Sequence, residues 1–140
     1  GIENLKPLPR RLFITKSREG IAIIDDSYNI SKDSIKAALE FLKEVFPANR
    51  KIIITAGLVE QGGKKSENNK CIGEKLKEVG DLILIIKNSN TPFLVKGIGV
   101  SRNKIIEYNN AKELNSDLPR IFKSGDAVLI FPYDLPAHYY

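Results

Sequence analysis

Apolar residues along this 140-residue chain occur in two patterns. Short uninterrupted apolar runs, of the length expected for strands buried in a sheet, stand apart from longer segments in which apolar residues recur every three or four positions. The short runs predict strands over residues 12–15, 21–24, 51–55, 82–86, 105–108 and 127–131. The longer segments predict helices over residues 31–46, about 67–79, 92–100 and 111–122.

The order of these elements predicts the fold class. The first two strands are separated only by residues 16–20, which include Gly20, so we expect them to form an antiparallel hairpin. After the hairpin, strands alternate with helices, which favours a mostly parallel sheet flanked by helices on both faces. We therefore expect residues 1–140 to form a single α/β domain, since a chain of this length can bury one core.

Local signals predict where the elements end. Ser31 and Ser34 supply capping oxygens at the start of the first helix, and Pro47 stops it. Pro119 is expected to disturb the end of the last helix. Residues 56–66 are polar and rich in glycine, so they predict a loop before the second helix.

The composition narrows the range of functions. The net charge is +5, but lysines and arginines are spread along the chain, so nucleic-acid binding is not favoured. No apolar run approaches the roughly 20 residues of a membrane span. The single cysteine, Cys71, fits a reducing cytoplasm and is expected to be a small buried hydrophobe within the second helix. Cys71 and the only histidine, His138, are too few for a structural zinc site, and we expect no metal site.

The side chains best suited to bind a ligand lie in the segment Asp25-Asp26-Ser27-Tyr28-Asn29. It directly follows a predicted strand, and ligands of open α/β sheets bind at the carboxyl ends of the strands. A carboxylate there can accept hydrogen bonds from ribose hydroxyls or hold a divalent cation, and a phenol can stack on a base. The alternative is a capped turn between a strand and a helix, which Asp, Ser and Asn also favour.

The sequence argues against two kinds of phosphate-handling domain, a phosphoryl-accepting receiver domain and a domain with a phosphate-binding glycine motif. A phosphoryl-accepting receiver domain needs an aspartate after the strand over residues 51–55, and no acid appears there until Glu60. Residues 57–66 follow a strand and precede a helix, but they match neither Gly, four residues, Gly-Lys-Ser/Thr nor Gly-x-Gly-x-x-Gly. The chain therefore carries no triphosphate-binding motif of its own, and these residues form either a surface loop or a loop facing the cleft beside Asp26.

The two ends of the chain contain further candidates. Arg10-Arg11 follows a stiff proline-containing entry segment, and an arginine there can pair with a phosphate through two hydrogen bonds or simply lie on the surface. The tail over residues 132–140 contains His138. No serine or cysteine can be paired with this histidine from the sequence, so a hydrolase triad has no support and an exposed tail residue is the simpler interpretation.

Several of these segments, taken in order, resemble the C-terminal domain of the Mur ligases, a family that joins amino acids or peptides to a cell-wall precursor. Residues 23–29 and 33–39 are similar to a motif of the branch that adds D-alanyl-D-alanine. Residues 9–12, 57–62 and 125–130 resemble its Pro-x-Arg-Leu/Phe, Gly-x-x-Glu-x-Gly and Gly-Asp-x-Val-Leu segments. Together these matches run over about residues 7–131.

The resemblance implies a Rossmann-like domain that closes over ATP bound by a central P-loop domain. That central domain and an N-terminal one would lie outside these 140 residues. The resemblance also implies two groups of site residues. Those contacting the nucleotide are Arg11 near the phosphates, Asp26 at the ribose, Tyr28 and Asn29. Those holding the incoming amino acid are Pro132, Asp134 and His138.

The implied partners are ATP with Mg²⁺, a UDP-linked muramoyl peptide, and an amino acid or dipeptide, in the cytoplasm. An acyl phosphate would form and an amine would attack it, releasing ADP and phosphate. This chain alone would hold no cofactor and would not be a competent ligase.

Two departures from the family leave the added amino acid undefined. Residues 29–32 replace Asn-x-Asn-Pro, and residues 131–136 replace a segment with Lys-Gly-Ser-Arg. A non-catalytic nucleotide- or partner-binding module on the same fold is the alternative.

Overall fold

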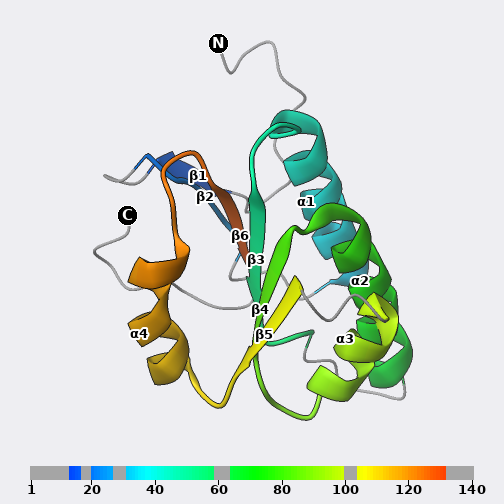
Figure 1. The fold of residues 1–140 in the computed structure, drawn as a ribbon. Coiled ribbons are helices and arrows are strands. Elements are labelled where there is room, and N and C mark those ends of the chain that lie inside the picture. The colour runs from blue at the N-terminus through cyan, green and yellow to red at the C-terminus, as the bar shows by residue number, and fades with distance from the viewer. Residues whose placement is uncertain (1–12, 17–19, 27–30, 59–63, 100–103, 132–140) are drawn as a thin grey trace.

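The computed structural model describes residues 13–16, 20–26, 31–58, 64–99 and 104–131 of the chain. Within these ranges the strands and helices alternate as the apolar pattern predicts (Figure 1). The strands are β1 (Phe13–Lys16), β2 (Ala22–Asp25), β3 (Lys51–Thr55), β4 (Leu82–Ile86), β5 (Ile105–Tyr108) and β6 (Ala127–Phe131). The helices are α1 (Lys32–Val45), α2 (Lys65–Val79), α3 (Thr91–Ile98) and α4 (Ala111–Ile121).

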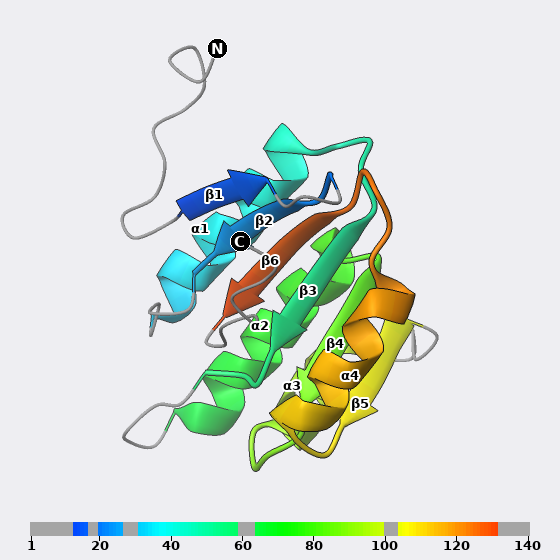
Figure 2. The ribbon, with the colours of Figure 1, turned by 90° about the vertical axis from the view of Figure 1, so that its left-hand side faces the viewer.

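The strands form one six-stranded sheet in the order β1-β2-β6-β3-β4-β5 (Figure 2). Strands β2 to β6 run parallel, and β1 pairs with β2 in the antiparallel direction. The last strand, β6, lies between β2 and β3, so that Leu129 is opposite both Ile24 and Ile53. The predicted α/β class, the mostly parallel sheet and the N-terminal hairpin are therefore confirmed, each strand of the hairpin being displaced by one residue.

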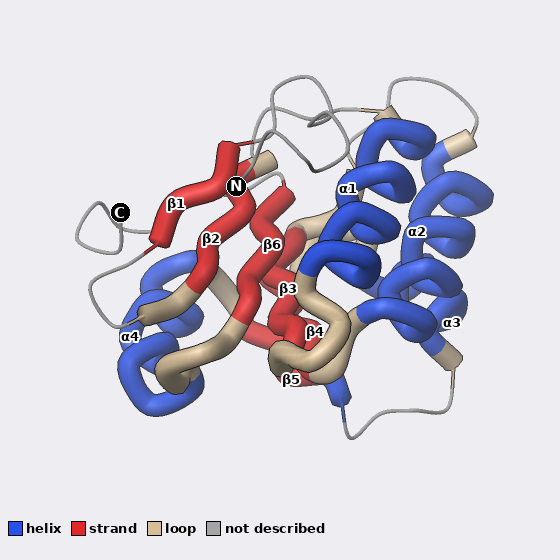
Figure 3. Tube along the Cα trace, turned by 90° about the horizontal axis from the view of Figure 1, so that it is seen from above, coloured by secondary structure: helices blue, strands red, loops and turns tan. Residues whose placement is uncertain are grey.

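Helices cover the two faces of the sheet unequally. Seen along the sheet, α1, α2 and α3 lie on one side and α4 lies on the other (Figure 3). Alternate residues of a strand face opposite sides, and two apolar clusters result. Ile53 and Leu129 belong to the cluster under α1, α2 and α3, whereas Ile52 and Val128 belong to the cluster on the side of α4. Every residue of β3 and β6 is buried, as expected for the centre of a parallel sheet.

The helix ends follow the predicted local signals with small shifts. Ser31 is the N-cap of α1, where its hydroxyl oxygen accepts a hydrogen bond from the backbone N of Ser34 (3.4 Å). Helix α2 begins at Lys65, so the predicted loop is two residues shorter than expected. Helix α4 continues through Pro119 and ends at Ile121. No helix within the described ranges is long and apolar enough to cross a membrane.

Helices α2 and α3 are in backbone contact at two glycines. A Cβ atom on Gly97 would lie 2.0 Å from the carbonyl oxygen of Lys70, and one on Gly73 would lie 2.3 Å from that of Leu94. These distances are far below any van der Waals contact, so both positions require glycine. The contact fixes α3 against α2, and with it the loop between β4 and α3.

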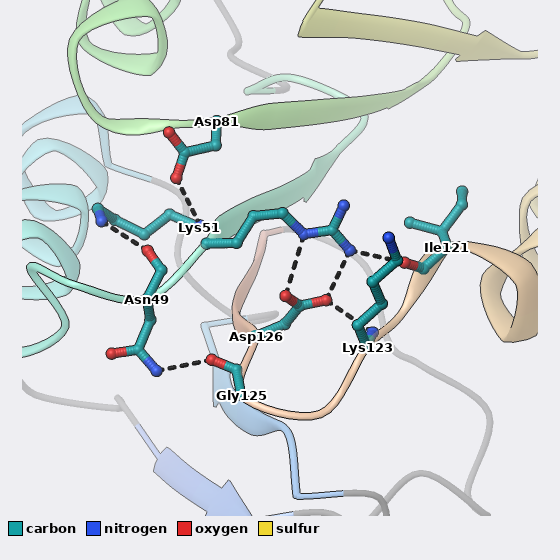
Figure 4. A network of polar contacts seen from close by, with 8 residues as sticks. Asn49, Lys51, Asp81, Ile121, Lys123, Gly125 and Asp126 are labelled. Carbon is teal, nitrogen blue, oxygen red and sulfur yellow. Dashed lines mark hydrogen bonds and ion pairs between the residues drawn. The ribbon is translucent and has the colours of Figure 1, made fainter.

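A charged network joins the elements at the amino edge of the sheet, the edge where the parallel strands begin (Figure 4). The Arg50 guanidinium donates to both carboxylate oxygens of Asp126 (3.0 and 2.7 Å) and to the carbonyl oxygen of Ile121 (2.6 Å). Asp126 is 3% exposed and also accepts from the backbone N of Lys123 (2.8 Å). The hydrogen bonds from Arg50 to Asp126 raise the pKa of the guanidinium. The network therefore holds the start of β3 beside the start of β6.

Two neighbouring contacts extend this network. The side-chain amide of Asn49 donates to the carbonyl oxygen of Gly125 (2.6 Å), and the carboxylate of Asp81 accepts from the backbone N of Lys51 (2.8 Å). Because Asp81 directly precedes β4, the starts of β3, β4 and β6 are all tied together (Figure 4). The Gly125-Asp126 pair thus has a structural role at the edge opposite the predicted nucleotide segment.

We expect Asp126→Asn to lower the free energy of unfolding by about 2–3 kcal/mol, because it leaves the Arg50 guanidinium facing a neutral amide in a mostly buried site. Urea denaturation measures the change. The control is Glu74→Gln on the exposed surface of α2, which should change the free energy of unfolding by less than about 0.5 kcal/mol. Equal denaturation midpoints for the two variants would contradict a stabilising role of the network.

Ion pairs at the surface of α1 and α2, two between the helices and one within α2, make the stability of the fold depend on pH. Lys75 contacts Glu40 (2.6 Å) and Glu78 (3.0 Å), and Lys43 contacts Glu78 (3.0 Å). The hydrogen bond from Lys75 lowers the pKa of Glu40 below its ordinary value of 4.5, and the hydrogen bonds from Lys43 and Lys75 lower the pKa of Glu78. The folded state therefore binds fewer protons than the unfolded state near this pH, and stability falls as the pH falls.

We expect the thermal midpoint to decrease between about pH 5 and about pH 3, as these two carboxylates become protonated. The double variant Glu40→Gln, Glu78→Gln should show a shallower decrease over the same interval, although it starts from a slightly lower midpoint at neutral pH. Thermal unfolding followed by circular dichroism at a series of pH values measures both slopes. Parallel curves for the two proteins would show that the ion pairs do not contribute.

A candidate ligand site at the carboxyl edge of the sheet

The parallel strands end together at one edge of the sheet, opposite the charged network. Strand β2 ends at Asp25, β3 at Thr55 and β6 at Phe131, and these three strands are adjacent. In Figure 2 the arrowheads of β6 and β3 point the same way, toward this edge. Ligands of open α/β sheets bind in crevices at the carboxyl ends of the strands, so this edge is the candidate site.

Of the predicted site residues, the described part of the chain contains Asp26. It directly follows β2, is 1% exposed, and its backbone N donates to the carbonyl oxygen of Ile130 (2.9 Å) in β6. Asp26 therefore lies at the carboxyl edge, where the sequence predicted it. Outside the described residues lie the other predicted members, which are Arg11, Tyr28, Asn29, Pro132, Asp134 and His138.

The backbone after β3 makes a tight turn at the same edge. The hydroxyl oxygen of Thr55 accepts from the backbone N of Gly57 (2.9 Å), and Gly57 has a φ angle of 86°. A Cβ atom there would lie 2.8 Å from the Cβ of Asn90, so both the backbone angle and the available space require glycine. Leu58, the next residue, is buried in the core. The first residues of the predicted loop are thus fixed in place.

Asn69, a fully buried residue of α2, bonds to this turn. Its side-chain oxygen accepts from the backbone N of Leu58 (2.8 Å). Its side-chain nitrogen donates to the carbonyl oxygens of Leu58 (3.0 Å) and Lys65 (2.9 Å). The amide thus connects the residue before the undescribed part of the loop to the first residue of α2.

Two asparagines in the loop after β4 bond to Ala56, in the loop after β3. The side-chain nitrogens of Asn88 (2.8 Å) and Asn90 (3.3 Å) both donate to the carbonyl oxygen of Ala56. The side-chain oxygen of Asn88 accepts from the backbone N of Asn90 (2.7 Å), and the hydroxyl of Thr91 accepts from the backbone N of Asn88 (2.9 Å). The loop after β4 is therefore attached to the loop after β3.

The sequence reasoning missed these asparagines. Asn88 and Asn90 follow a strand, where asparagine is typical of turns, but nothing in the sequence identifies their distant partner. Asn69 had a clearer signal, because it lies three residues before Ile72 and seven before Leu76, on the apolar face of α2. A polar residue at a position that the helix period assigns to the core indicates a buried hydrogen-bonding role.

A cavity of about 810 Å³ opens between the first turns of α1 and α2. The positive ends of both helix dipoles lie at these first turns, which favours negatively charged groups there. Two lysines and two acids line the cavity, so its side-chain charge is balanced. The lining residues are Ser31, Lys32 and Asp33 of the α1 region, and Lys64, Glu67, Asn68 and Cys71 of the α2 region.

The position of Cys71 corrects one prediction. The sequence predicted a buried small hydrophobe, whereas the structure places Cys71 partly exposed in the wall of this cavity. Its sulfur lies 3.8 Å from the ammonium nitrogen of Lys36 on α1. The reason is its place on the side of α2 that faces the start of α1, rather than on the side that faces the sheet. In the described part of the chain, no three His, Cys, Asp or Glu residues are grouped so that they could hold a metal ion.

Comparisons with known proteins agree with this geometry. The family model of the Mur ligase glutamate ligase domain matches residues 10–133. The UDP-N-acetylmuramoyl-tripeptide–D-alanyl-D-alanine ligase of Escherichia coli K12 is 33% identical over 101 residues, which are 71% of this chain and 22% of that protein. The ligase of the same name from Bacillus subtilis 168 is 23% identical over 131 residues, 92% of this chain and 29% of that protein.

Solved structures give the same result. The MurF ligase of Thermotoga maritima, determined in complex with ADP, matches with a TM-score of 0.71 and 27% identity over 91% of this chain and 28% of that one. MurF of Acinetobacter baumannii shares the fold, with a TM-score of 0.70 at 20% identity over 92% of this chain and 28% of that one. The chain therefore spans less than a third of the length of these relatives. On this evidence the chain belongs to the Mur ligase family and corresponds to its C-terminal domain.

Proposed function

We propose that the chain is the nucleotide- and amino-acid-binding C-terminal domain of an ATP-dependent, ADP-forming amide ligase that acts on a cell-wall precursor in the cytoplasm. The family match over residues 10–133 carries this proposal, because it covers nearly the whole chain and includes the carboxyl edge. In this proposal residues 1–140 are one domain, and an N-terminal domain and a central P-loop domain complete the enzyme.

The position of Asp26 supports its assignment to the nucleotide. A carboxylate at the carboxyl end of a strand can accept hydrogen bonds from both ribose hydroxyls, and Asp26 directly follows β2 at that edge. Tyr28 and Asn29 come next in the sequence, before α1 begins, and we assign them to the same nucleotide. Arg11 precedes β1, and we assign its guanidinium to the phosphates, which it can bind through two hydrogen bonds.

The course of β6 supports the assignment of Pro132, Asp134 and His138 to the incoming amino acid or dipeptide. These residues follow Phe131, the last residue of β6, which lies between β2 and β3. The chain therefore leaves the sheet at the middle of its carboxyl edge, next to β2, the strand that Asp26 follows. We propose that the departure from the Lys-Gly-Ser-Arg segment at this point sets the choice of acceptor.

The reaction proposed for the complete enzyme transfers the terminal phosphoryl group of ATP to a carboxylate of the UDP-linked muramoyl peptide. The amine of the amino acid or dipeptide then attacks the acyl phosphate, forming an amide and releasing phosphate. The sequence contains no P-loop, the motif that in P-loop enzymes cradles the phosphates and supplies a Ser/Thr ligand to Mg²⁺. We therefore assign the Mg²⁺ and the phosphate-binding loop to the central domain, and to this chain the binding and orientation of the nucleoside and the amine.

A non-catalytic binding module is the second candidate. The absence of both common phosphate-binding motifs from the sequence favours it, because a domain with this fold could bind a nucleotide or a partner without any reaction. A Gly-x-x-x-x-Gly-Lys-Ser/Thr segment in the same polypeptide or in a tightly associated one would support the ligase. Its absence from both would support the binding module.

We expect this chain by itself to hydrolyse no ATP and to bind it weakly, with a dissociation constant of about 1 mM or higher, because the P-loop and its Mg²⁺ supply most of the phosphate contacts. Isothermal titration calorimetry with ATP and Mg²⁺ tests this. Binding near 1 μM, about a thousandfold tighter, would contradict the proposed division of the site between domains.

In the complete ligase, we expect Asp26→Asn to raise the KM for ATP about tenfold while kcat changes less, because a ribose contact is made equally in the ground state and in the transition state. Steady-state kinetics at varied ATP concentration measures both constants. Asp81→Asn is the matched control, since it removes an aspartate that bonds to the backbone at the opposite edge of the sheet. A KM that stays unchanged in folded Asp26→Asn would remove this residue from the nucleotide site.

A further inference from the structure

One buried amide joins Leu58, near the start of the segment that links β3 to α2, to Lys65, the first residue of α2. Asn69 is fully buried, and its oxygen and nitrogen bond to Leu58 on one side of that segment and to Lys65 on the other. Its acceptor and both of its donors are used, at distances from 2.8 to 3.0 Å. The side chain therefore links the backbone of residue 58 to that of residue 65.

The choice of asparagine at this position is costly for the helix. Asparagine has a lower helix propensity than leucine, and burying an amide without partners is unfavourable. Position 69 lies on the same face of α2 as Ile72 and Leu76, where the helix period predicts an apolar side chain. The three hydrogen bonds offset the cost of burial, and what they add beyond an apolar side chain is a fixed backbone at Leu58.

A second buried amide, that of Asn90, bonds to the same stretch of backbone. Asn90 is 2% exposed, and its side-chain oxygen lies 3.5 Å from the side-chain nitrogen of Asn69. Asn90 also donates to the carbonyl oxygen of Ala56, while Thr55 bonds to the backbone N of Gly57. Side chains from β3, from α2 and from the β4–α3 loop thus bond to three successive backbone units at the carboxyl edge.

We propose that Asn69 is a positioning residue of this domain, holding the Ala56–Leu58 backbone in one geometry at the edge where nucleotide and acceptor bind. The inference rests on the proposed ligase function. Asn69 is buried under the backbone that it holds, and it acts on the reaction through that backbone. A preorganised backbone lowers the barrier of a reaction between aligned groups, and a misplacement of about 1 Å can cost about 100-fold in rate.

Asn69→Leu in the complete ligase separates this role from simple stability. Leucine has the same branched shape and suits the apolar face of α2, but it removes all four side-chain hydrogen bonds, three to backbone groups and one to Asn90. We expect kcat to fall about tenfold or more, while the KM for ATP stays within about threefold of the wild-type value, because alignment rather than binding is lost. Hydrogen exchange should become faster in the peptide that contains Gly57 and Leu58, and should stay unchanged in the peptide that contains Ile121 and Lys123.

Asp126→Asn is the matched control, because it also removes a buried hydrogen-bonding group, but at the amino edge. Its kcat should remain near the wild-type value even where its thermal midpoint falls as far as that of Asn69→Leu. If both variants lost activity in proportion to their stability, Asn69 would be a structural residue and the proposal would be overturned. Should Asn69→Leu fail to fold, Asn69→Ser, which keeps a small hydrogen-bonding group, replaces it with the same expected division between kcat and KM.

The outcomes also distinguish this inference from the proposed function. Wild-type ligase activity together with unchanged kcat in Asn69→Leu would overturn the positioning role alone. A complete wild-type protein that formed no amide with any muramoyl peptide and acceptor would overturn both. Faster exchange at Gly57 and Leu58 combined with a selective loss of kcat would support both.

Discussion

The position of the last strand is the constraint on which this domain depends. Strand β6 pairs with β2 on one side and with β3 on the other, and all of its residues are buried. Without β6, the hairpin and the β3-β4-β5 half of the sheet have no strand in common. The Arg50–Asp126 pair at the start of β6 holds this insertion in register, since it joins the residue before β3 to the residue before β6.

The two edges of the sheet are stabilised by different chemistry. The amino edge uses ionised groups, with a nearly buried carboxylate between an arginine and a backbone N–H. At the carboxyl edge, the loops after β3 and β4 are held by neutral side chains: Asn69, Asn88 and Asn90 bond to backbone groups of residues 56–58, and the side chains of Asn69 and Asn90 bond to each other. Neutral amides fix the backbone without adding charge. The electrostatic interactions of a nucleotide bound at this edge would therefore come mainly from the charged residues proposed to contact it, Arg11 and Asp26.

The sequence predicted the elements better than it predicted their arrangement. Residues 51–55, 82–86 and 127–131 are strands with the expected bounds, because continuous apolar runs suit strands buried on both faces. The insertion of β6 between β2 and β3 could not be predicted from the alternation of strands and helices, since that alternation is compatible with several strand orders. At the site, Asp26 was predicted because a carboxylate directly after an apolar run is a local signal. Asn88 and Asn90 were missed because their partner, Ala56, is more than thirty residues away.

The central place of β6 has a consequence for how the protein is made. The chain leaves the ribosome N-terminus first, so β2 and β3 emerge well before β6, which lies between them in the sheet. At about 5–20 residues per second, the stretch from the end of β3 to the end of β6 takes several seconds to synthesise. During that interval the edges of β2 and β3 that face β6 in the native sheet have no native partner, while β2 can pair with β1 and β3 with β4. Chaperone binding would therefore protect the nascent chain most during this interval, which ends only when residues 127–131 leave the exit tunnel.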